Sequence, residues 1–442
     1  MDKNKKKTLI KKISKKEEEI AIKLSDKIWE LAEPPLLEKE SSKLIAQYLE
    51  ANGFNITWPF KVLPTAFKAE KGKGRPVIGM LGEYDALPDC GKKKGTYGHG
   101  CGHNLLGVAP AVGAVTISKI IEEKNIPGKI VYWGCPAEET LVGKAYMARD
   151  GGFKNMDVCL CWHPSPRNTI KTSGGAALDS FIFEFKGRTS HAAGSPHKGR
   201  SALDSAILMD VAVNYLREHV PENVRIHSVI CDGGKAPNVV PEYSKIWYYV
   251  RGRNRAQVDE ISHRLILCAK GAAIATETEM TVSKITSIYN FLPNQALAEI
   301  IRDNFQLFGP HKISHSDIEN IKALGKEPLF STNINTNVVA GEPGRASSDE
   351  ATVSWLSPLG GFGTACVSQN TTFHNRDFTM QGNLPFAHKG MMKAAELFAG
   401  TAFDLFTDKN LLRKVIKEFK SKTKDFKFDP LLLKQHSPDT GS

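Results

Sequence analysis

Short apolar runs with the composition of buried strands alternate with helical patterns through much of this chain. Strands are expected in "TAFKAEKGKGRPVIGMLGEYD", "KIVYWGCPAEE" and "DVCLCWHPSP", and helices over residues 17–32, 37–51, 105–124 and 141–149. Alternation of this kind is typical of helices packed on a largely parallel sheet. The pattern therefore predicts an α/β fold with a mostly parallel central sheet.

The alternation is interrupted between residues 176 and 288. There "AALDSFIFEFKGRTSHA" repeats Phe at every second position, which predicts a half-exposed strand, and further strands and two helices follow in mixed order. Such an order predicts a small α+β, ferredoxin-like insert. The α/β pattern then returns, with strands expected in "NTNVVAGEP" and "FGTACVS". We expect a discontinuous domain of residues 1–175 and 289–442 that carries an inserted domain of residues 176–288.

The net charge of +11 lies mostly in the two ends of the chain. Residues 1–20 contribute +4 and residues 409–442 contribute +5, which leaves +2 for everything between them. Basic ends of this kind either bind RNA or anionic membranes or are solvated helical ends, and we favour solvated ends.

The eight cysteines are scattered, the N-terminus lacks the apolar core of a secretory signal, and no apolar run approaches the ~20 residues that a membrane span needs. We expect a cytoplasmic protein without a membrane partner.

The stretch "GHGCGHN" places Cys101 and His103 on a glycine-rich loop before the 105–124 helix. Glycines allow the backbone to approach an ion closely. A structural zinc site would need a second matching pair of ligands, and a thioredoxin-like C-x-x-C is absent. Taken alone, the motif leaves metal binding and a Cys–His catalytic pair open.

Further candidate residues follow the predicted strands. Glu138 and Glu139 in "CPAEE" can divide metal binding from proton transfer, or they can form a surface pair at the start of the next helix. Taken singly, His163 and His374 fit core histidines, and Asp85 could orient a ligand. The candidates in "GHGCGHN", "CPAEE" and "WHPSP" converge, however, on the carboxyl ends of strands in one sheet, where open α/β sheets build their sites. Such a ligand set suits Zn²⁺ or Mn²⁺.

These motifs resemble those of the M20 metallopeptidases, particularly the amidohydrolase branch and, within it, the B-type subunits of p-aminobenzoyl-glutamate hydrolases. The matching stretches run from about residue 80 to 392 and include "GEYDALPD", "GHGCGHNLLG", "CPAEE", "WHPSP", "GRTSHAAGSPHKGRSALDS", "ASSDEATVSWLSP" and "FHNRDF". Many family members carry H-x-D where this chain has Glu83-Tyr84-Asp85, so that histidine is missing. The resemblance implies a phosphorylase/hydrolase-like catalytic domain with two divalent metal ions in each copy of the chain.

The resemblance also implies roles for individual residues. The implied ligands are Cys101, His103, Glu139, His163 and His374. Glu138 would be the general base, and Asp85 would support the catalytic centre.

The insert resembles the family's lid domain, which also mediates dimerisation. On it, His191 would donate to a substrate carbonyl as an oxyanion donor, and Asn238 and Arg251 would contact polar groups of the substrate. Ser348 and Asp349 would line the acyl side of the pocket, or would form the N-cap of a core helix. We expect a homodimer through the lid domain, and the subfamily also suggests a related second subunit.

Three functions remain open from the sequence. The first is a metal-dependent amidohydrolase that cleaves N-acyl or N-aroyl amino acids such as p-aminobenzoyl-glutamate. The second is a dipeptidase for β-alanyl or γ-linked dipeptides, whose free amino group would need an acidic partner such as Asp349 or Glu350. The third is a non-catalytic metal- or RNA-binding protein, which the complete ligand set and Glu138 disfavour. We therefore favour an enzyme with a small-molecule amide substrate and without a nucleic-acid partner.

Overall fold

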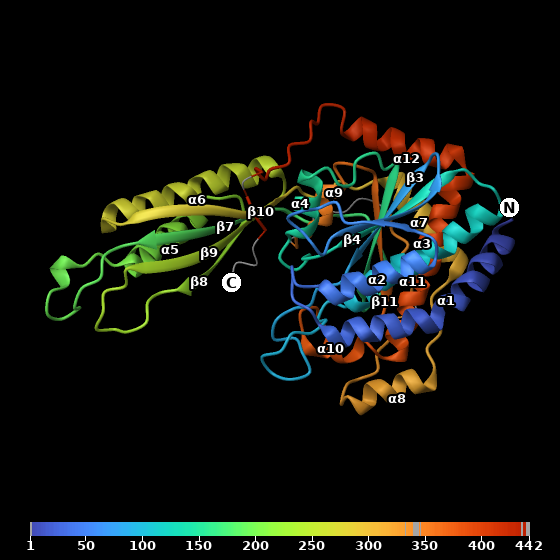
Figure 1. The fold of residues 1–442 in the computed structure, drawn as a ribbon, viewed down its shortest axis with the longest axis horizontal. Coiled ribbons are helices and arrows are strands. Elements are labelled where there is room, and N and C mark those ends of the chain that lie inside the picture. Colours follow the sequence, from blue (N-terminus) through green and yellow to red (C-terminus); the bar gives the residue numbers. More distant parts are fainter. Residues whose placement is uncertain (1, 332, 339–343, 345, 435, 439–442) are drawn as a thin grey trace. The chain divides into compact units, whose positions relative to one another are not determined.

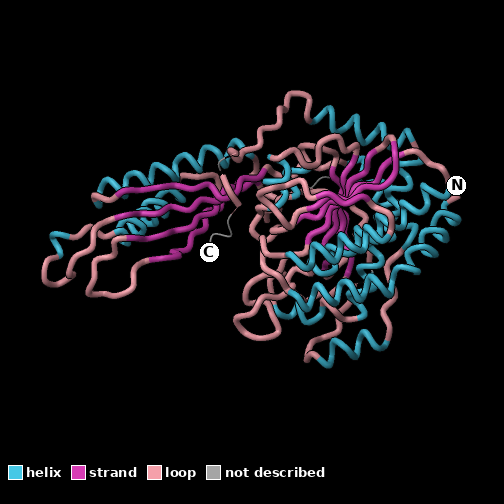
Figure 2. Tube along the Cα trace, viewed as in Figure 1, coloured by secondary structure: helices cyan, strands magenta, loops and turns pink. Residues whose placement is uncertain are grey.

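The computed structural model describes residues 2–331, 333–338, 344, 346–434 and 436–438. The chain forms two compact units (Figure 1). The first unit comprises Met1–Gly174, Leu292–Glu342 and Thr352–Asp429, and the second comprises Gly175–Phe291, Pro343–Ala351 and Pro430–Ser442. Helices and strands alternate in the first unit, whereas a compact sheet with two long helices forms the second (Figure 2).

A seven-stranded sheet with the order β1-β2-β4-β3-β5-β11-β6 organises the first unit. Its strands are β1 (Asn55–Thr57), β2 (Phe67–Lys73), β3 (Val77–Glu83), β4 (Gly128–Cys135), β5 (Val158–Ser165), β6 (Thr169–Lys171) and β11 (Leu359–Ala365). The four central strands, β4, β3, β5 and β11, run parallel, while the flanking strands pair in the antiparallel direction. The predicted mostly parallel central sheet is confirmed. Because β4 lies between β2 and β3, those two strands do not form a hairpin.

Helices surround this sheet and supply most of the first unit's core. They are α1 (Lys3–Leu31), α2 (Lys39–Ala51), α3 (His103–Glu123), α4 (Gly143–Arg149), α7 (Gln295–Phe308), α8 (His315–Ala323), α9 (Glu350–Val353, which runs from the second unit into the first), α10 (Arg376–Gln381), α11 (Pro385–Thr407) and α12 (Lys409–Lys422). α3, α7 and α11 pack on the sheet, and α1 packs outside them on α3 and α11. Leu105, Val112, Phe398 and Ile130 are among the fully buried residues of this core.

α1 begins at Lys3, fourteen residues earlier than the helix expected from the apolar pattern. Its first turns are not simply a solvated basic end. Lys6 is buried, and its Nζ lies 2.7 Å from Asp404 of α11 and 2.7 Å from the Asn304 side chain. A lysine can be buried in this way because a carboxylate and an amide oxygen satisfy its ammonium group.

α3 is long and apolar enough to cross a membrane by length and composition, and no other helix among the described residues passes that test. Of its most apolar window, however, 94% is buried inside the protein. The helix is apolar on all sides because it lies between the sheet and the helices α1 and α11. Its composition is therefore that of a core helix.

The second unit has the chain order β7, α5, β8, β9, α6, β10 and the antiparallel strand order β10-β7-β9-β8. Its elements are β7 (Ala177–Lys186), the short 3₁₀ helix Pro196–Lys198, α5 (Ala202–Glu218), β8 (Arg225–Asp232), β9 (Tyr243–Gly252), α6 (Arg255–Thr276) and β10 (Glu279–Ile288). α5 and α6 pack on each other and on β7 and β9, over a core that includes Phe181, Phe183 and Phe185. This βαββαβ arrangement is the ferredoxin-like topology that the sequence predicts.

Two local predictions are wrong. β7 is not half-exposed, since all its residues up to Phe183 are buried. It is a central strand, and on the face opposite the phenylalanines Trp247 of β9 donates a hydrogen bond to Ser180. Residues 335–338 of the expected strand "NTNVVAGEP" are irregular, and residues 339–343 lie outside the described part of the chain. The Asn, Gly and Pro residues of this stretch favour turns over strands.

Candidate metal centre and active site

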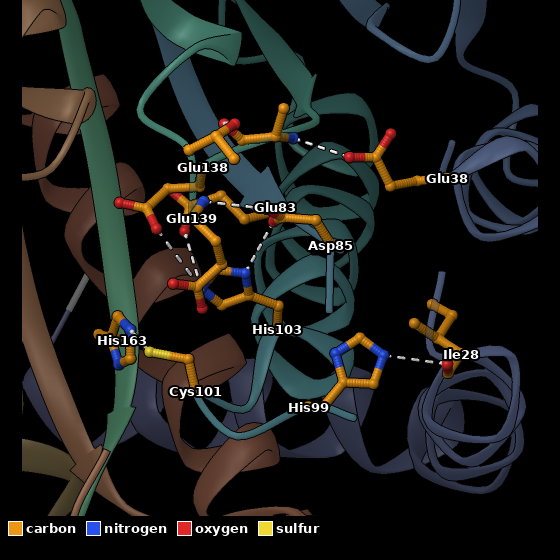
Figure 3. Close-up of polar contacts among 12 residues, drawn as sticks. Ile28, Glu38, Glu83, Asp85, His99, Cys101, His103, Glu138, Glu139 and His163 are labelled. Carbon is orange, nitrogen blue, oxygen red and sulfur yellow. Dashed lines mark hydrogen bonds and ion pairs between the residues drawn. The ribbon is translucent and has the colours of Figure 1, made fainter. Parts of the chain in front are cut away.

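The candidate centre lies where the parallel strands of the first unit end. β4, β3 and β5 are neighbours in the sheet, so their carboxyl ends meet at one edge. Glu83 is the last residue of β3, His163 lies near the end of β5, and Glu138 and Glu139 follow shortly after β4. Their side chains converge on one small volume together with His103 (Figure 3).

The glycine-containing loop before α3 delivers two of the predicted ligands. His103 is the first residue of α3, and Cys101 lies two residues before it. Gly102 between them adopts a φ of 77°, and a Cβ there would come within 2.7 Å of Pro164 and 2.8 Å of the Phe378 ring. Only glycine combines this backbone conformation with so close an approach. The loop can therefore turn sharply and place both side chains on the same side.

Asp85 holds the imidazole of His103 from behind. Its Oδ1 accepts a hydrogen bond from His103 Nδ1 at 2.9 Å, and its Oδ2 accepts from the backbone N–H of Glu139 at 2.9 Å. Burial lowers the pKa of His103, but the charge and hydrogen bond of Asp85 outweigh burial, and the net shift is well upward. The hydrogen bond to Asp85 keeps one proton on Nδ1, so a metal ion that displaces the proton on Nε2 would find that nitrogen directed at the centre.

Acidic side chains surround this Nε2 atom. It lies 3.6 Å from Glu83, 3.7 Å from Glu139 and 3.9 Å from Glu138, measured to the nearest carboxylate oxygen of each. The turn that carries the adjacent glutamates contains Ala137 with a φ of 52°. Burial raises the pKa of Glu139 to about 7. Burial disfavours several charged carboxylates at such close range, and a cation bound among them would offset that cost.

Cys101 and His163 form the second part of the centre. Cys101 Sγ lies 3.3 Å from His163 Nε2, while His163 Nδ1 donates to the carbonyl oxygen of Pro164 at 2.7 Å. Burial lowers the pKa of His163 to about 4. Burial and the charge of Glu139 raise the pKa of the Cys101 thiol well above its usual value. A neutral imidazole and a thiol therefore face each other, and a bound metal ion would convert the thiol to a thiolate.

His374 completes the set from a segment far along the chain. Its Nε2 lies 3.3 Å from Glu139 Oε2, and its backbone N–H donates to the carbonyl oxygen of Gly100 at 2.9 Å. The loop that carries His374 is thus tied directly to the loop that carries Cys101. The structure brings all five predicted ligands and the predicted base Glu138 together.

The donor atoms fit divalent metal ions. Three groups of ligand atoms each lie within 4.8 Å of one another: Cys101, His103 and His163; Cys101, Glu139 and His374; and Glu83, His103 and Glu138. His103 Nε2 is buried and has no hydrogen-bond partner among the described residues. A buried nitrogen without a partner, aimed into a cluster of sulfur and carboxylate donors, is the chemistry of a metal ligand.

Comparison with known proteins identifies the family. The chain is 33% identical to the B-type subunit of p-aminobenzoyl-glutamate hydrolase from Escherichia coli (strain K12), over 90% of this chain and 92% of that protein. The chain belongs to the M20 family. Another relative is the Xaa-Arg dipeptidase of Mus musculus, at 30% identity over 91% of this chain and 89% of that protein.

Two further comparisons agree with the M20 assignment. Residues 174–277 match the peptidase dimerisation domain of M20 proteins, and they fall in the second compact unit apart from the first residue. The fold matches the crystal structure of a dinuclear metal-binding M20 peptidase from Bacillus subtilis with a TM-score of 0.57, at 18% identity over 89% of this chain and 99% of that one. As a member of this family, the chain is a hydrolase that acts on amide bonds.

Two loops of the second unit of this M20 protein carry the predicted substrate residues His191 and Asn238. His191 and Asn238 are exposed on two loops that contact each other, since the N–H of Ala192 donates to the carbonyl oxygen of Asn238 at 3.0 Å. The ring of His191 is fixed locally, because its Nδ1 accepts from the N–H of Gly194 at 3.0 Å. Its Nε2 is thereby left to donate. The substrate roles of these residues stay predictions.

Arg251 lies in a cationic part of the second unit. It pairs across the strands with Arg225, it lies 5.7 Å from the ring of Tyr249, and its charge contributes to lowering the pKa of His227 after burial. Burial also lowers the pKa of Arg251 itself, and its Nε has no hydrogen-bond partner among the described residues. A partly buried guanidinium among other cations is a suitable place for a carboxylate.

Ser348 and Asp349 also cluster with the second unit. Ser348 Oγ accepts from the N–H of Glu350 at 3.4 Å at the start of α9, which fits the alternative of a weak helix cap. Asp349 is fully buried. Neither observation decides whether these residues contact a substrate, so that role stays a prediction.

Sequence reasoning missed two buried residues beside the centre. Lys144 of α4 is fully buried, with its Nζ 2.7 Å from Glu83 Oε1. Glu38 is also fully buried, and its Oε1 accepts from the backbone N–H of Ala137 at 2.8 Å. One sequence signal for Lys144 exists: it lies six residues after Glu138, on a helix that the sequence predicts directly after the same strand end. No local pattern connects residue 38 with residue 137.

Proposed function

We propose that this chain is a metal-dependent amidohydrolase that cleaves the amide bond of N-acyl or N-aroyl amino acids. The model substrate is p-aminobenzoyl-glutamate, after the relative that is 33% identical along nearly the whole chain. The observation that carries the proposal is the pair Glu138 and Glu139 beside the buried Nε2 of His103. One carboxylate of this pair can bind metal while its neighbour is left for proton transfer.

The ligands in this proposal are Cys101, His103, Glu139, His163 and His374, which would hold two divalent ions, Mn²⁺ or Zn²⁺. When bound, such ions supply Lewis acidity, which makes water more acidic and polarises the amide carbonyl. Glu138 takes the proton from the attacking water and delivers it to the leaving nitrogen. Asp85 keeps the proton of His103 on Nδ1 and so keeps Nε2 directed at the centre.

Binding of the amino-acid half is assigned to the second unit. We propose that Arg251 binds the carboxylate of the substrate, because its guanidinium is partly buried beside His227 and Arg225. His191 would donate from Nε2 to the carbonyl oxygen as negative charge develops there, and Asn238 would contact a polar group. The exposed position of His191 and Asn238 on contacting loops supports this assignment.

We further propose a homodimer formed through the second unit. The outer face of α5 exposes Ile207, Leu208, Val211 and Tyr215, and the edge strand β8 exposes Val229 and Ile230. An apolar helix face beside a free strand edge favours a partner of the same kind, and the match to a peptidase dimerisation domain supports a second copy. A related second subunit, as the name of the Escherichia coli relative suggests, is the alternative partner. We place the enzyme in the cytoplasm.

The decisive experiment is hydrolysis of p-aminobenzoyl-glutamate by protein stripped with a chelator and reloaded with Mn²⁺ or Zn²⁺. In the variant Glu138→Gln, kcat should fall by about 10²- to 10⁴-fold while metal content by elemental analysis stays at the parental value. Glu123→Gln, at the exposed end of α3, is the matched control and should keep full activity. Turnover by Glu138→Gln at the parental rate would show that the base is another residue.

A dipeptidase is the second candidate, since the chain is 30% identical to an Xaa-Arg dipeptidase. Asp349 and Glu350 are buried carboxylates that could bind the free amino group of a dipeptide. A panel of aroyl-glutamates, β-alanyl and γ-linked dipeptides, and dipeptides ending in arginine separates the two candidates. Preference for a free amino group over an aroyl group would favour the dipeptidase.

A further inference from the structure

The turn after β4 has to aim two neighbouring glutamates in different directions. Ala137, at its start, adopts a φ of 52°, which is an uncommon conformation for a residue with a side chain and carries a strain of order 1 kcal/mol. Such a conformation persists only where the surroundings hold it. Two buried carboxylates do so here, one at each end of the turn (Figure 3).

Asp85 holds the far end of the turn. Its Oδ2 accepts from the N–H of Glu139, and its Oδ1 accepts from His103. Both of these partners are ligands in the proposed metal centre. Asp85 therefore fixes the metal-binding side of the turn.

Glu38 holds the near end. It lies in the connection between α1 and α2 and is fully buried. Its Oε1 accepts from the N–H of Ala137 at 2.8 Å and from the N–H of Leu36 at 2.9 Å, and its Oε2 accepts from the hydroxyl of Thr65 at 2.9 Å. The carboxyl group of Glu38 thus connects its own segment, which includes Leu36, with Thr65 and Ala137. Ala137 is the residue immediately before Glu138.

We propose that Glu38 is a positioning residue that fixes the base side of the turn and so aims Glu138, while Asp85 fixes the ligand side. This inference rests on the proposed function, in which Glu138 is the base. It assigns the two anchors separable effects. Loss of Glu38 impairs proton transfer and leaves metal binding in place, because Glu139 keeps its hydrogen bond to Asp85.

The hydrogen bonds of Glu38 define a set of informative variants. Glu38→Gln keeps an oxygen that can accept from Leu36 and Ala137, and its amide can donate to Thr65. Glu38→Met has similar length but no acceptor. Glu38→Asp keeps the carboxyl group but withdraws its oxygens by the length of one methylene. Thr65→Val is the matched control, because it removes a hydrogen bond of Glu38 and leaves the one to Ala137.

The test combines kinetics with amide exchange in the full chain. In Glu38→Met and Glu38→Asp, kcat for p-aminobenzoyl-glutamate should fall at least tenfold, with KM within about twofold and metal content unchanged. Hydrogen–deuterium exchange resolved by electron-transfer fragmentation should accelerate at the amide of Ala137 and stay slow at that of Glu139. Glu38→Gln and Thr65→Val should remain within about threefold of the parental kcat. If Glu38→Met does not fold, Glu38→Asp against Glu38→Gln decides.

Each other outcome overturns a definite part of this reasoning. Parental kcat and unchanged exchange at Ala137 in both impaired variants would show that Glu38 positions nothing. Parallel losses of kcat, metal content and thermal stability would show a general structural role and would also overturn the proposal. If the parental protein does not hydrolyse the substrate, the proposed function fails, and the exchange at Ala137 and Glu139 still decides whether the two anchors are separate.

Discussion

Replacing Lys144 by Met should destabilise the protein strongly, and a metal ion should reverse part of the loss. Lys144 is fully buried on α4, and its Nζ lies 2.7 Å from Oε1 of the buried Glu83. Methionine has nearly the same length and fills the same space without the charge. Glu83 would then be a buried carboxylate that has lost its closest cation.

The magnitude follows from this geometry. At 2.7 Å and an effective dielectric constant of about 20, the Coulomb attraction of the pair is about 6 kcal/mol. Part of that is offset because burying the lysine itself costs desolvation energy. Breaking a buried ion pair by removing one partner typically costs about 3–5 kcal/mol, and we expect Lys144→Met to fall in this range in metal-free protein.

Metal binding provides an internal check on the cause. The second oxygen of Glu83, Oε2, lies 3.6 Å from His103 Nε2, inside the proposed centre. A divalent ion held there supplies positive charge close to Glu83. Saturating Mn²⁺ or Zn²⁺ should therefore stabilise Lys144→Met more than it stabilises the parental protein.

The assay is unfolding in guanidinium chloride followed by circular dichroism, with chelator and with metal. Lys94→Met, at an exposed loop position, is the control and should change stability by less than about 0.5 kcal/mol. The double variant Glu83→Gln with Lys144→Met should be more stable than Lys144→Met alone, because it removes the uncompensated charge. A single variant as stable as the parent, or a double variant less stable than the single one, would refute the reasoning.

Two further predictions concern stability in acid and assembly. Burial and the nearby lysines lower the pKa of His311 to about 4, so the unfolded state binds its proton more readily and stability falls as the pH drops from about 6.5 towards 4. Neither ring nitrogen of His311 has a hydrogen-bond partner among the described residues, and the centre of its ring lies 4.7 Å from that of Phe386, so phenylalanine can replace it. Between pH 7 and pH 5, the free energy of unfolding of His311→Phe should fall by about 2 kcal/mol less than that of the parent, as measured in urea titrations. An equal fall in both proteins would exclude His311 as the cause. Ile207→Lys with Val211→Lys on the exposed face of α5 should convert a dimer to monomer in light scattering at unchanged Tm, whereas a persistent dimer would place the interface elsewhere.

The main features of the fold could be predicted because they depend on local periodicity. Strands and helices follow from apolar patterns, and the mixed pattern of residues 176–288 indicates the ferredoxin-like unit. The start of α1 was missed because its first turns are lysine-rich and pack through isolated residues such as Ile10 and Lys6. The exposure of β7 was misjudged because period-two phenylalanines reveal one face of a strand but not what covers the other.

The candidate site divides in the same way. Its ligands lie in short motifs that the sequence displays, and strand ends at one edge of a sheet account for their convergence. The supporting residues lack such a signal. Glu38 and Lys144 act through contacts with Ala137 and Glu83 that exist only in the folded chain. That these two ionisable side chains are buried is visible only in the three-dimensional structure.

The strand order of the first unit has a consequence for synthesis on the ribosome. β11 pairs with β5 on one side and β6 on the other, yet about 190 residues separate the end of β5 from the start of β11. At ~5–20 residues per second, β5 waits roughly 10–40 s for its neighbour. During that interval β5 and β6 have no β11 strand to pair with, and the nascent chain does not yet contain His374. The inserted unit, whose strands are all made in this interval, can fold first, and metal capture with all five ligands can occur only after residue 374 has been made.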